Sequence, residues 1–166
     1  MYIIYKNDNG KNIVIAPTPN CGLTIEQIAE KDVPKGKQYI ITDTIPVDIE
    51  ELKQQKWHEI KSIRDQKEQS GFPYSNKTLD SDSISVQRIS VAAVNAQTAL
   101  LLKLPFEISW KCADNTELLL DAQGILGVTA ALAQYSNSLH IKARNIKVLI
   151  DNATTAEEVQ DITWVN

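Results

Sequence analysis

Cysteine and histidine are scarce in this sequence. Its 166 residues include two cysteines, Cys21 and Cys112, and two histidines, His58 and His140. Two cysteines are too few for a disulfide framework, and the spacing of these four residues fits no zinc ligand set. A chain of this length buries roughly two thirds of the surface that it exposes when unfolded. It therefore needs neither disulfide bonds nor a structural metal to fold. We therefore expect free thiols, a reducing compartment, no metal and no cofactor.

An excess of basic residues is also missing. Lysine and arginine number 17 against 21 aspartate and glutamate residues, which gives a net charge of −4. Nucleic acids and anionic membranes are bound by basic faces, so neither is an expected partner. No apolar run reaches the roughly 20 residues that span a bilayer, and the first residues lack the basic and long apolar segments of a signal peptide. The sequence predicts a protein that is used inside a cell or assembled into a particle there.

Patterns that resemble catalytic or metal sites are few, and each has a simpler explanation. His58 and Glu59 are adjacent on a predicted helix, where neighbouring side chains point about 100° apart, so the carboxylate cannot orient the imidazole. Ser136 and His140 share one helical face, but a helical serine lacks the strained turn of a nucleophile elbow. Residues 79–83 are rich in oxygen ligands but lack the glycine and the distant glutamate of a calcium loop. The sequence thus predicts no catalytic, cofactor-binding or metal-binding residue.

Turn and cap residues predict a small α+β unit over residues 1–45. A turn-forming Asn-Asp-Asn-Gly segment separates two β-rich runs, as in a hairpin, and Thr24 and Gln27 form a capping box. The predicted elements are, in chain order, a strand over 2–5, a strand over 13–16, a helix from Thr24 to about residue 31 and a strand over 39–42. A unit of this size is too small to be stable alone, so we expect it to pack on the rest of the chain or on a partner.

The segment 46–70 is predicted to be a connecting helix. Pro46 marks the junction, and Asp48 and Glu51 form a second capping box with acidic residues in the first helical turn. The apolar stripe of the helix is narrow and has Trp57 at its margin; its other members are Ile49, Leu52, Ile60 and Ile63. Because the remaining faces are polar, we expect a half-exposed helix that is able to pair with a second copy of the chain.

Residues 71–166 are predicted to form a C-terminal domain of two long helices packed on a β-hairpin. Its elements are, in chain order, a helix from Asp82 or Ser83 to about residue 104, a strand over 106–110, a strand over 117–120, a helix over 122–150 and a short helix that begins at the Thr155 capping box. The whole chain is therefore expected to be α+β, with a small N-terminal β-hairpin/helix unit, a connecting helix and this C-terminal domain.

Two features of the long helices concern their packing. Several residues lie along the first of them together with alanines that allow close helix packing; the residues are Ile84, Gln87, Val91, Val94, Thr98 and Leu101, and the alanines are Ala92, Ala93, Ala96 and Ala99. The second helix contains Gly124 and Gly127, each of which weakens a helix by about 1 kcal/mol relative to alanine. These glycines predict an irregular start for the second helix.

Aromatic side chains are favoured both in cores and at interfaces. Trp110 lies on an alternating strand, which favours a core position. Trp57, at the edge of a largely polar helix, is the aromatic residue that we assign most readily to a contact with a partner or between units. Tyr39, Phe72 and Tyr74 are the further candidates for partner binding.

Motifs over most of the chain resemble a known family. They are, in chain order, the segment 60–65, Ser81-Asp82, the tryptophan–turn–strand block 108–115 with 118–121, His140 with Ala143-Arg144 and Ile150, and the cap at 155–159. Together they resemble a domain that recurs in tailed bacteriophages and prophages, often encoded beside tail-fibre genes. The segments 28–36 and 39–41 are similar to leader segments of small phage tail-associated proteins.

This resemblance implies a non-enzymatic phage or prophage tail protein. A tail-fibre assembly chaperone that binds a fibre protein in the cytoplasm of a bacterial host is the favoured interpretation. The alternatives are a structural component of the virion tail and a phage protein directed at the host. A hydrolase that uses Ser136 or His140 is the alternative from a different class. The family suggests no catalytic residue for this chain.

Overall fold

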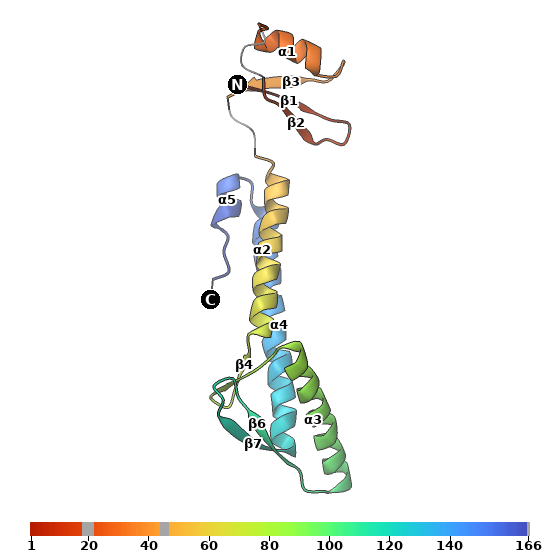
Figure 1. Ribbon diagram of the computed structural model, residues 1–166, viewed down its shortest axis with the longest axis vertical. Coiled ribbons are helices and arrows are strands. Elements are labelled where there is room, and N and C mark those ends of the chain that lie inside the picture. Colours follow the sequence, from red (N-terminus) through yellow and green to blue (C-terminus); the bar gives the residue numbers. More distant parts are fainter. Residues whose placement is uncertain (18–21, 44–46, 166) are drawn as a thin grey trace. The chain divides into compact units, whose positions relative to one another are not determined.

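The computed structural model describes residues 1–17, 22–43 and 47–165, and the chain divides into two compact units, Met1–Leu52 and Lys53–Asn166 (Figure 1). Pro46, at the predicted junction, lies outside the described residues. Cys21 does so as well, whereas Cys112 is a buried free thiol. The α+β fold class predicted from the sequence is confirmed.

The first unit is a three-stranded antiparallel sheet with one helix. Its elements are β1 (Tyr2–Lys6), β2 (Asn12–Ile15), α1 (Ile25–Asp32) and β3 (Tyr39–Thr42), and the strand order is β2-β1-β3. The predicted hairpin and third strand are confirmed. So is the capping box, because Thr24 Oγ1 accepts the Gln27 N–H and Gln27 Oε1 accepts the Thr24 N–H. Helix α1 covers one face of the sheet through a core of Ile3, Ile28, Ala29 and Val33.

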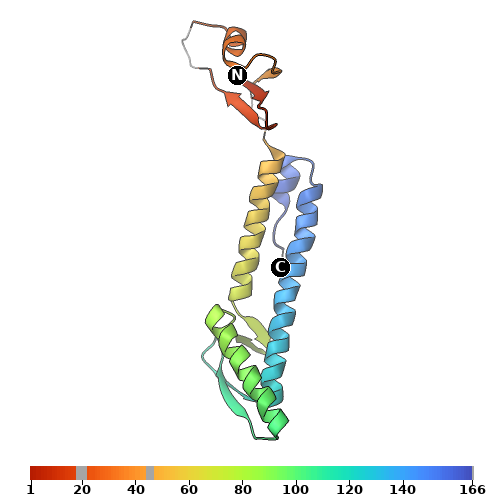
Figure 2. The ribbon, with the colours of Figure 1, turned by 90° about the vertical axis from the view of Figure 1, so that its right-hand side faces the viewer.

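The second unit is built on one long helix. Helix α4 (Ala122–Asn152) lies beside α2 (Ile49–Gln69) in both views (Figures 1 and 2). Ile60 of α2 is fully buried against Ala143, Ile146 and Ile150 of α4. A short helix, α5 (Ala156–Asp161), begins at the predicted capping box, and the chain after it adds Trp164 to the same cluster.

The first half of α4 supports the main core of this unit. It packs against helix α3 and two hairpins: α3 (Ser83–Leu102), β4 (Phe72–Tyr74) with β5 (Lys77–Leu79), and β6 (Glu107–Lys111) with β7 (Glu117–Asp121). Phe72, Leu79, Trp110 and Ile125 are among its buried side chains. The predicted β6–β7 hairpin and the core position of Trp110 are confirmed.

Helix α3 packs on α4 through its small side chains. Its buried residues are Ile89, Ala92, Ala93, Ala96 and Ala99. Alanines let two helix backbones approach closely, so this face gains more contact from α4 than a face of larger side chains would. The line of larger residues that begins at Ile84 and ends at Leu101 is therefore turned away from the core.

Helix α4 starts regularly in spite of its two glycines, which corrects the expectation of an irregular start. Asp121 caps it by accepting the Gly124 N–H at 2.7 Å. Gly127 makes room for Tyr74, whose hydroxyl donates to the Gly124 carbonyl at 2.9 Å. A Cβ at Gly127 would lie 2.7 Å from the Tyr74 hydroxyl oxygen, which is too close for any real contact.

This arrangement predicts that Gly127→Ala destabilises the second unit by about 1–2 kcal/mol, because the Tyr74 hydroxyl is displaced and the Gly124 carbonyl loses its partner. The same substitution in a Tyr74→Phe background should instead stabilise by about 0.5–1 kcal/mol, since alanine is the better helix former and the clashing atom is gone. Urea unfolding of the four variants in this cycle measures both values. An equal effect of Gly127→Ala in the two backgrounds would contradict the assigned contact.

Candidate interaction surfaces

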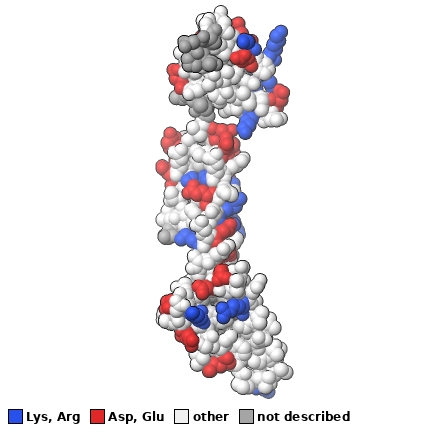
Figure 3. Space-filling model, in the orientation of Figure 1, with Lys and Arg blue, Asp and Glu red and all other residues white. Residues whose placement is uncertain are grey.

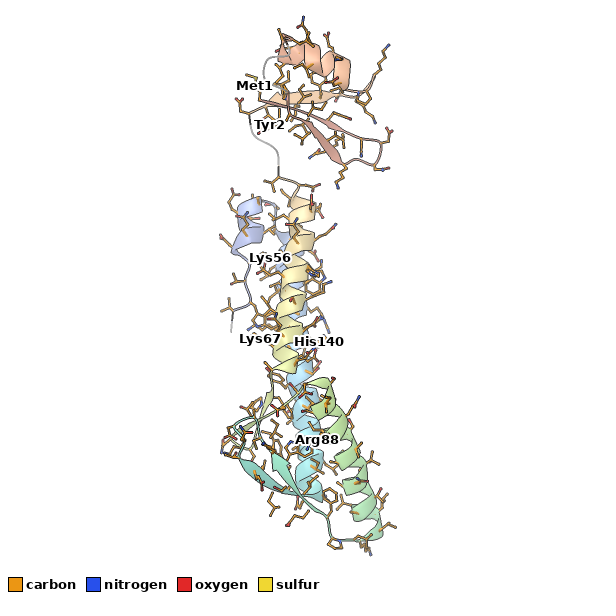
Figure 4. The ribbon with its side chains drawn as sticks, in the orientation of Figure 1. Met1, Tyr2, Lys56, Lys67, Arg88 and His140 are labelled. Atoms are coloured by element: carbon orange, nitrogen blue, oxygen red, sulfur yellow. The ribbon has the colours of Figure 1, made fainter. Side chains whose placement is uncertain are left out.

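The structure places a carboxylate between Ser136 and His140. Both residues lie on α4 and contact Glu68 near the end of α2. Figure 4 labels His140 on α4 and Lys67, the residue before Glu68, on α2. The Ser136 hydroxyl donates to one oxygen of Glu68, and His140 Nε2 lies 3.4 Å from the other. Because Ser136 lies 68 positions from Glu68 in the chain, and His140 lies further still, no local sequence pattern identifies Glu68 as the third member.

The order of these three groups differs from that of a nucleophilic triad. In a triad the imidazole accepts the serine proton and the carboxylate orients the imidazole. Here the carboxylate itself accepts the serine hydroxyl, so the imidazole is not placed to activate Ser136. The cluster ties α2 to α4, and Tyr135 adds a hydrogen bond from its hydroxyl to the Lys67 carbonyl at 3.4 Å. His58, the other histidine, is exposed on α2.

The acidic segment 79–83 serves as a junction between elements. Asp82 caps α3 by accepting the N–H groups of Ile84 and Ser85. The buried Ser81 hydroxyl accepts the Gly71 N–H at 2.8 Å and donates to the Glu68 carbonyl at 2.6 Å. Among the described residues, no group of three or more histidine, cysteine, aspartate and glutamate side chains is arranged to hold a metal ion.

The shifted pKa values in the second unit belong to carboxyls at turns and helix caps. The Thr116 hydroxyl donates to Asp114 at 2.5 Å and lowers the pKa of that carboxyl from 3.8 to about 2. The Ser85 hydroxyl lowers the pKa of Asp82 in the same way. Both carboxyls order a backbone segment, as carboxylates at turns and N-caps commonly do.

The four aromatic candidates for partner binding lie in different environments. The assignment of Phe72 was wrong, because its side chain is fully buried in the main core and offers no surface to a partner. Tyr74 is half-buried against the same core and is held by its hydrogen bond to Gly124. Trp57 is half-buried on the α2–α4 cluster, with the ammonium groups of Lys61 and Lys147 each 5.8 Å from its ring centre.

Tyr39 lies in the first unit, on an edge strand of the sheet. It is 37% exposed and helps to line a hollow of about 910 Å³, together with Lys6, Lys37 and Ile40. Tyr39 thus lies beside a concave surface that is open to another molecule.

One face of this sheet is covered by α1 and the other carries an apolar row. Strand pairing places Val14 and Ile40 on either side of Ile4. Alternation along the strands turns this row away from α1, which packs on Ile3. Ile4 is 4% exposed, whereas Val14 is 37% and Ile40 58% exposed. The row is thus an apolar strip that crosses all three strands.

A second apolar surface lies on α3. The exposed fractions of Ile84, Val91, Val94 and Leu101 are 67%, 63%, 61% and 83%. Arg88 is the sole charged residue in the 20 residues of this helix, and the surface over α3 is largely white in Figure 3. A groove of about 410 Å³ runs between this face and strand β6, and Ile108 and Trp110 line its far side.

The sequence contained a signal for this surface. Successive residues of one α3 face are separated by three, four, three, four and three positions, and the helix contains almost no charged residue. These residues are Ile84, Gln87, Val91, Val94, Thr98 and Leu101. The exposed side of α3 mixes these apolar residues with uncharged polar ones such as Gln87 and Thr98, and nothing among the described residues covers it.

The described helices include none that is both long enough and apolar enough to cross a membrane.

The fold and these surfaces define an α+β protein with exposed apolar faces on both of its units. Residues 51–163 match a family described as a domain of unknown function (DUF4376), and the chain belongs to this family. The match includes nearly all of the second unit and leaves most of the first outside. No curated protein and no solved structure matches the chain.

Proposed function

We propose that this chain is a non-enzymatic phage or prophage tail protein that acts as an assembly chaperone for a tail-fibre protein. The observation that carries the proposal is the apolar row on the open face of the first unit. Its members Val14 and Ile40 are exposed although both lie on a regular sheet. An assembly chaperone must cover apolar surface of its client before that client finds its final partner, and an apolar sheet face offers matching surface.

The resemblance to phage tail proteins supports a tail-fibre protein as the client. The residues that carry this part of the resemblance, 28–36 and 39–41, belong to the same unit as the apolar row and include Ile40. An extended segment of the fibre protein would cross the row and enter the hollow beside Tyr39. Burial of apolar side chains would supply affinity, and Lys6 and Lys37 at the hollow would favour an acidic residue in the segment.

Co-expression with a tail-fibre protein of the same phage or prophage tests the proposal. We expect soluble fibre protein that co-purifies with the chain, and at least a tenfold loss of that complex in Ile40→Asp, because a carboxylate cannot be desolvated against an apolar client. Leu119→Asp is the matched control. Leu119 is also an aliphatic residue on a strand and is 63% exposed, but it lies in the second unit. Fibre protein that is equally soluble without this chain would refute the chaperone role.

Two alternatives remain as proposals of the same class: a structural component of the virion tail, and a phage protein directed at the host. A chaperone acts in the bacterial cytoplasm and is absent from the assembled phage particle, whereas a structural component remains in the particle. Mass spectrometry of purified particles separates these roles. Peptides of this chain at a stoichiometry comparable to that of tail proteins would favour the structural component.

A further inference from the structure

An extended segment, residues 162–165, follows α5 and runs back along α2 and α4 (Figures 1 and 2). Its first residue, Ile162, has φ −71° and ψ 121°, which is extended backbone. Ile162 and Trp164 pack on the hydrophobic cluster between α2 and α4, whereas Thr163 and Val165 are exposed. Alternate side chains of an extended peptide point to opposite sides. The segment therefore lies on the two helices as a bound peptide would, with one side in contact and the other in water.

Two lysines, one from each helix, hold the backbone of this segment and of the residue before it in α5. Lys56 of α2, labelled in Figure 4, places its ammonium nitrogen 3.5 Å from the Gln160 carbonyl oxygen. The Lys142 ammonium of α4 donates to the Val165 carbonyl and lies 5.3 Å from the centre of the Trp164 ring. Carbonyl groups are present in any peptide, whereas a cation over a ring favours an aromatic residue. The contacts thus combine recognition of the backbone with a preference for particular side chains, as in other sites for extended peptides.

The segment is held less firmly than the helix before it. Val159 of α5 is fully buried, whereas Ile162 and Trp164 are each half-buried. A backbone hydrogen bond of the segment is internal to it, from the Val165 N–H to the Thr163 carbonyl at 3.1 Å. Parts of a structure with few buried contacts open at the lowest cost in free energy. Residues 162–165 can therefore leave their position while Val159 keeps α5 in place.

Departure of the segment uncovers one side of an apolar cluster. The members of the cluster are at most 7% exposed while Ile162 and Trp164 cover it, and Trp57 packs beside them; these members are Ile60, Ala143, Ile146 and Ile150. Exposure of this apolar surface to water is unfavourable, so the open form needs another molecule in place of the segment. The residues that already fit define what that molecule must offer: an extended backbone, an aliphatic side chain and an aromatic one two positions later.

We propose that this α2–α4 surface is a docking site for an extended segment of a partner protein with an aliphatic-x-aromatic pattern, and that residues 162–165 occupy it until the partner displaces them. A tethered segment competes at an effective concentration on the order of millimolar. The site is thus closed to weak, isolated peptides and opens to a partner held nearby by a further contact. The inference concerns the second unit alone, so it and the chaperone proposal for the first unit can fail separately.

Binding of a fluorescently labelled peptide with the sequence of residues 160–166 tests the site. In the full chain, Ile162→Ala with Trp164→Ala vacates the surface, and fluorescence anisotropy should show binding about tenfold tighter than to the parent chain, where the segment competes. Adding Lys142→Met should weaken this binding about fivefold, because the carbonyl and the ring lose their cation. Arg144→Met is the matched control: Arg144 is exposed and points about 200° away around α4, so binding should not change. A folded double variant that binds no peptide would overturn the proposal.

Peptide variants test the side-chain preference. Trp164→Ala in the peptide should weaken binding about tenfold, since a tryptophan anchor is lost, whereas Trp164→Phe should retain most of the affinity. Val165→Ala is the control, because Val165 is 69% exposed in the occupied site. Equal affinities of the Trp164→Ala and parent peptides would reject recognition of the pattern.

Fluorine NMR of the parent chain labelled with 5-fluorotryptophan tests displacement without any vacated variant. The chain has three tryptophans, and Trp164→Phe assigns the resonance of Trp164. Millimolar peptide should move that resonance to the position of a solvent-exposed tryptophan and leave Trp110, in the main core, unchanged. An unmoved Trp164 resonance when peptide is bound would overturn the proposal. A parent chain that is dimeric, and monomeric once Ile162→Ala and Trp164→Ala are introduced, would make a second copy the occupant and reject a partner protein.

Discussion

Phe72→Ala is expected to destabilise the second unit by about 3–5 kcal/mol. Phe72 is fully buried, and its ring packs in the core with Leu79, Ile89 and Ile125. Removing it takes away the apolar area that folding had buried and leaves a cavity that two short strands and two helices cannot close. Urea unfolding followed by far-ultraviolet circular dichroism measures the change in the free energy of unfolding.

Leu119→Ala is the control for this prediction, because Leu119 is a large apolar side chain on the same unit but is 63% exposed. Its truncation should change the free energy of unfolding by less than about 0.5 kcal/mol. The comparison also separates the two interpretations of Phe72. If Phe72→Ala kept full stability and lost partner binding, the core position would be refuted and the interface assignment restored.

Gly71→Ala should cost on the order of 2–3 kcal/mol, because the backbone at this position suits only glycine. Gly71 has a φ of +99°, and a Cβ there would lie 2.9 Å from the Thr78 methyl group and 3.0 Å from the Leu79 carbonyl oxygen. The Thr78 side chain can rotate away, but the Leu79 carbonyl belongs to a strand of the hairpin. The backbone must therefore shift, and the shift weakens the 2.8 Å hydrogen bond from the Gly71 N–H to Ser81.

Asn115→Ala separates the two causes of this effect. Asn115 also has a positive φ, +63°, but its side chain is exposed at the β6–β7 turn. Its substitution should cost about 1 kcal/mol or less, which is the backbone contribution alone. Thermal unfolding of both variants gives the difference. Equal losses would show that close contact with Leu79 adds nothing to the cost at Gly71.

Helix starts and hairpins in this chain were predictable because short segments specify them. The Thr24–Gln27 and Thr155–Glu158 capping boxes need four residues each, and both form as expected. The strands over 2–5 and 13–16 follow from local alternation and turn residues, and their pairing follows from the hairpin turn at Asn7. Elements of this kind depend on neighbours in the chain and not on distant packing.

The environments of individual side chains depended on distant residues and were harder to predict. Phe72 follows the end of a helix in a polar stretch of the sequence. It is buried because α3 and α4, which come later in the chain, pack against it. Gly127 was interpreted as a weakness of α4 because its neighbour Tyr74 is far away in the sequence. Ser136 and His140 were paired correctly on one helical face, but the glutamate that joins them comes from α2.

Helix α3 shows the limit of periodicity as a guide. Both of its apolar sides have helical spacing, so a pattern search finds two candidate core faces and cannot rank them. The alanine side faces α4, since close backbone approach brings more atoms into contact than larger side chains would allow. The second side then stays available, and its near-complete lack of charge is what distinguishes it from an ordinary solvent-facing stripe.

The 31 residues of α4 belong to two hydrophobic clusters at once. Its first half supplies Ile125 and Val128 to one, and its second half supplies Ala143 and Ile150 to the other. Loss of either cluster would leave half of an uninterrupted helix without its apolar support, and isolated helical segments of that length are marginal in water. The helix therefore couples the two ends of the unit energetically, so that damage confined to one hairpin lowers the resistance of the distant α5 end to unfolding as well.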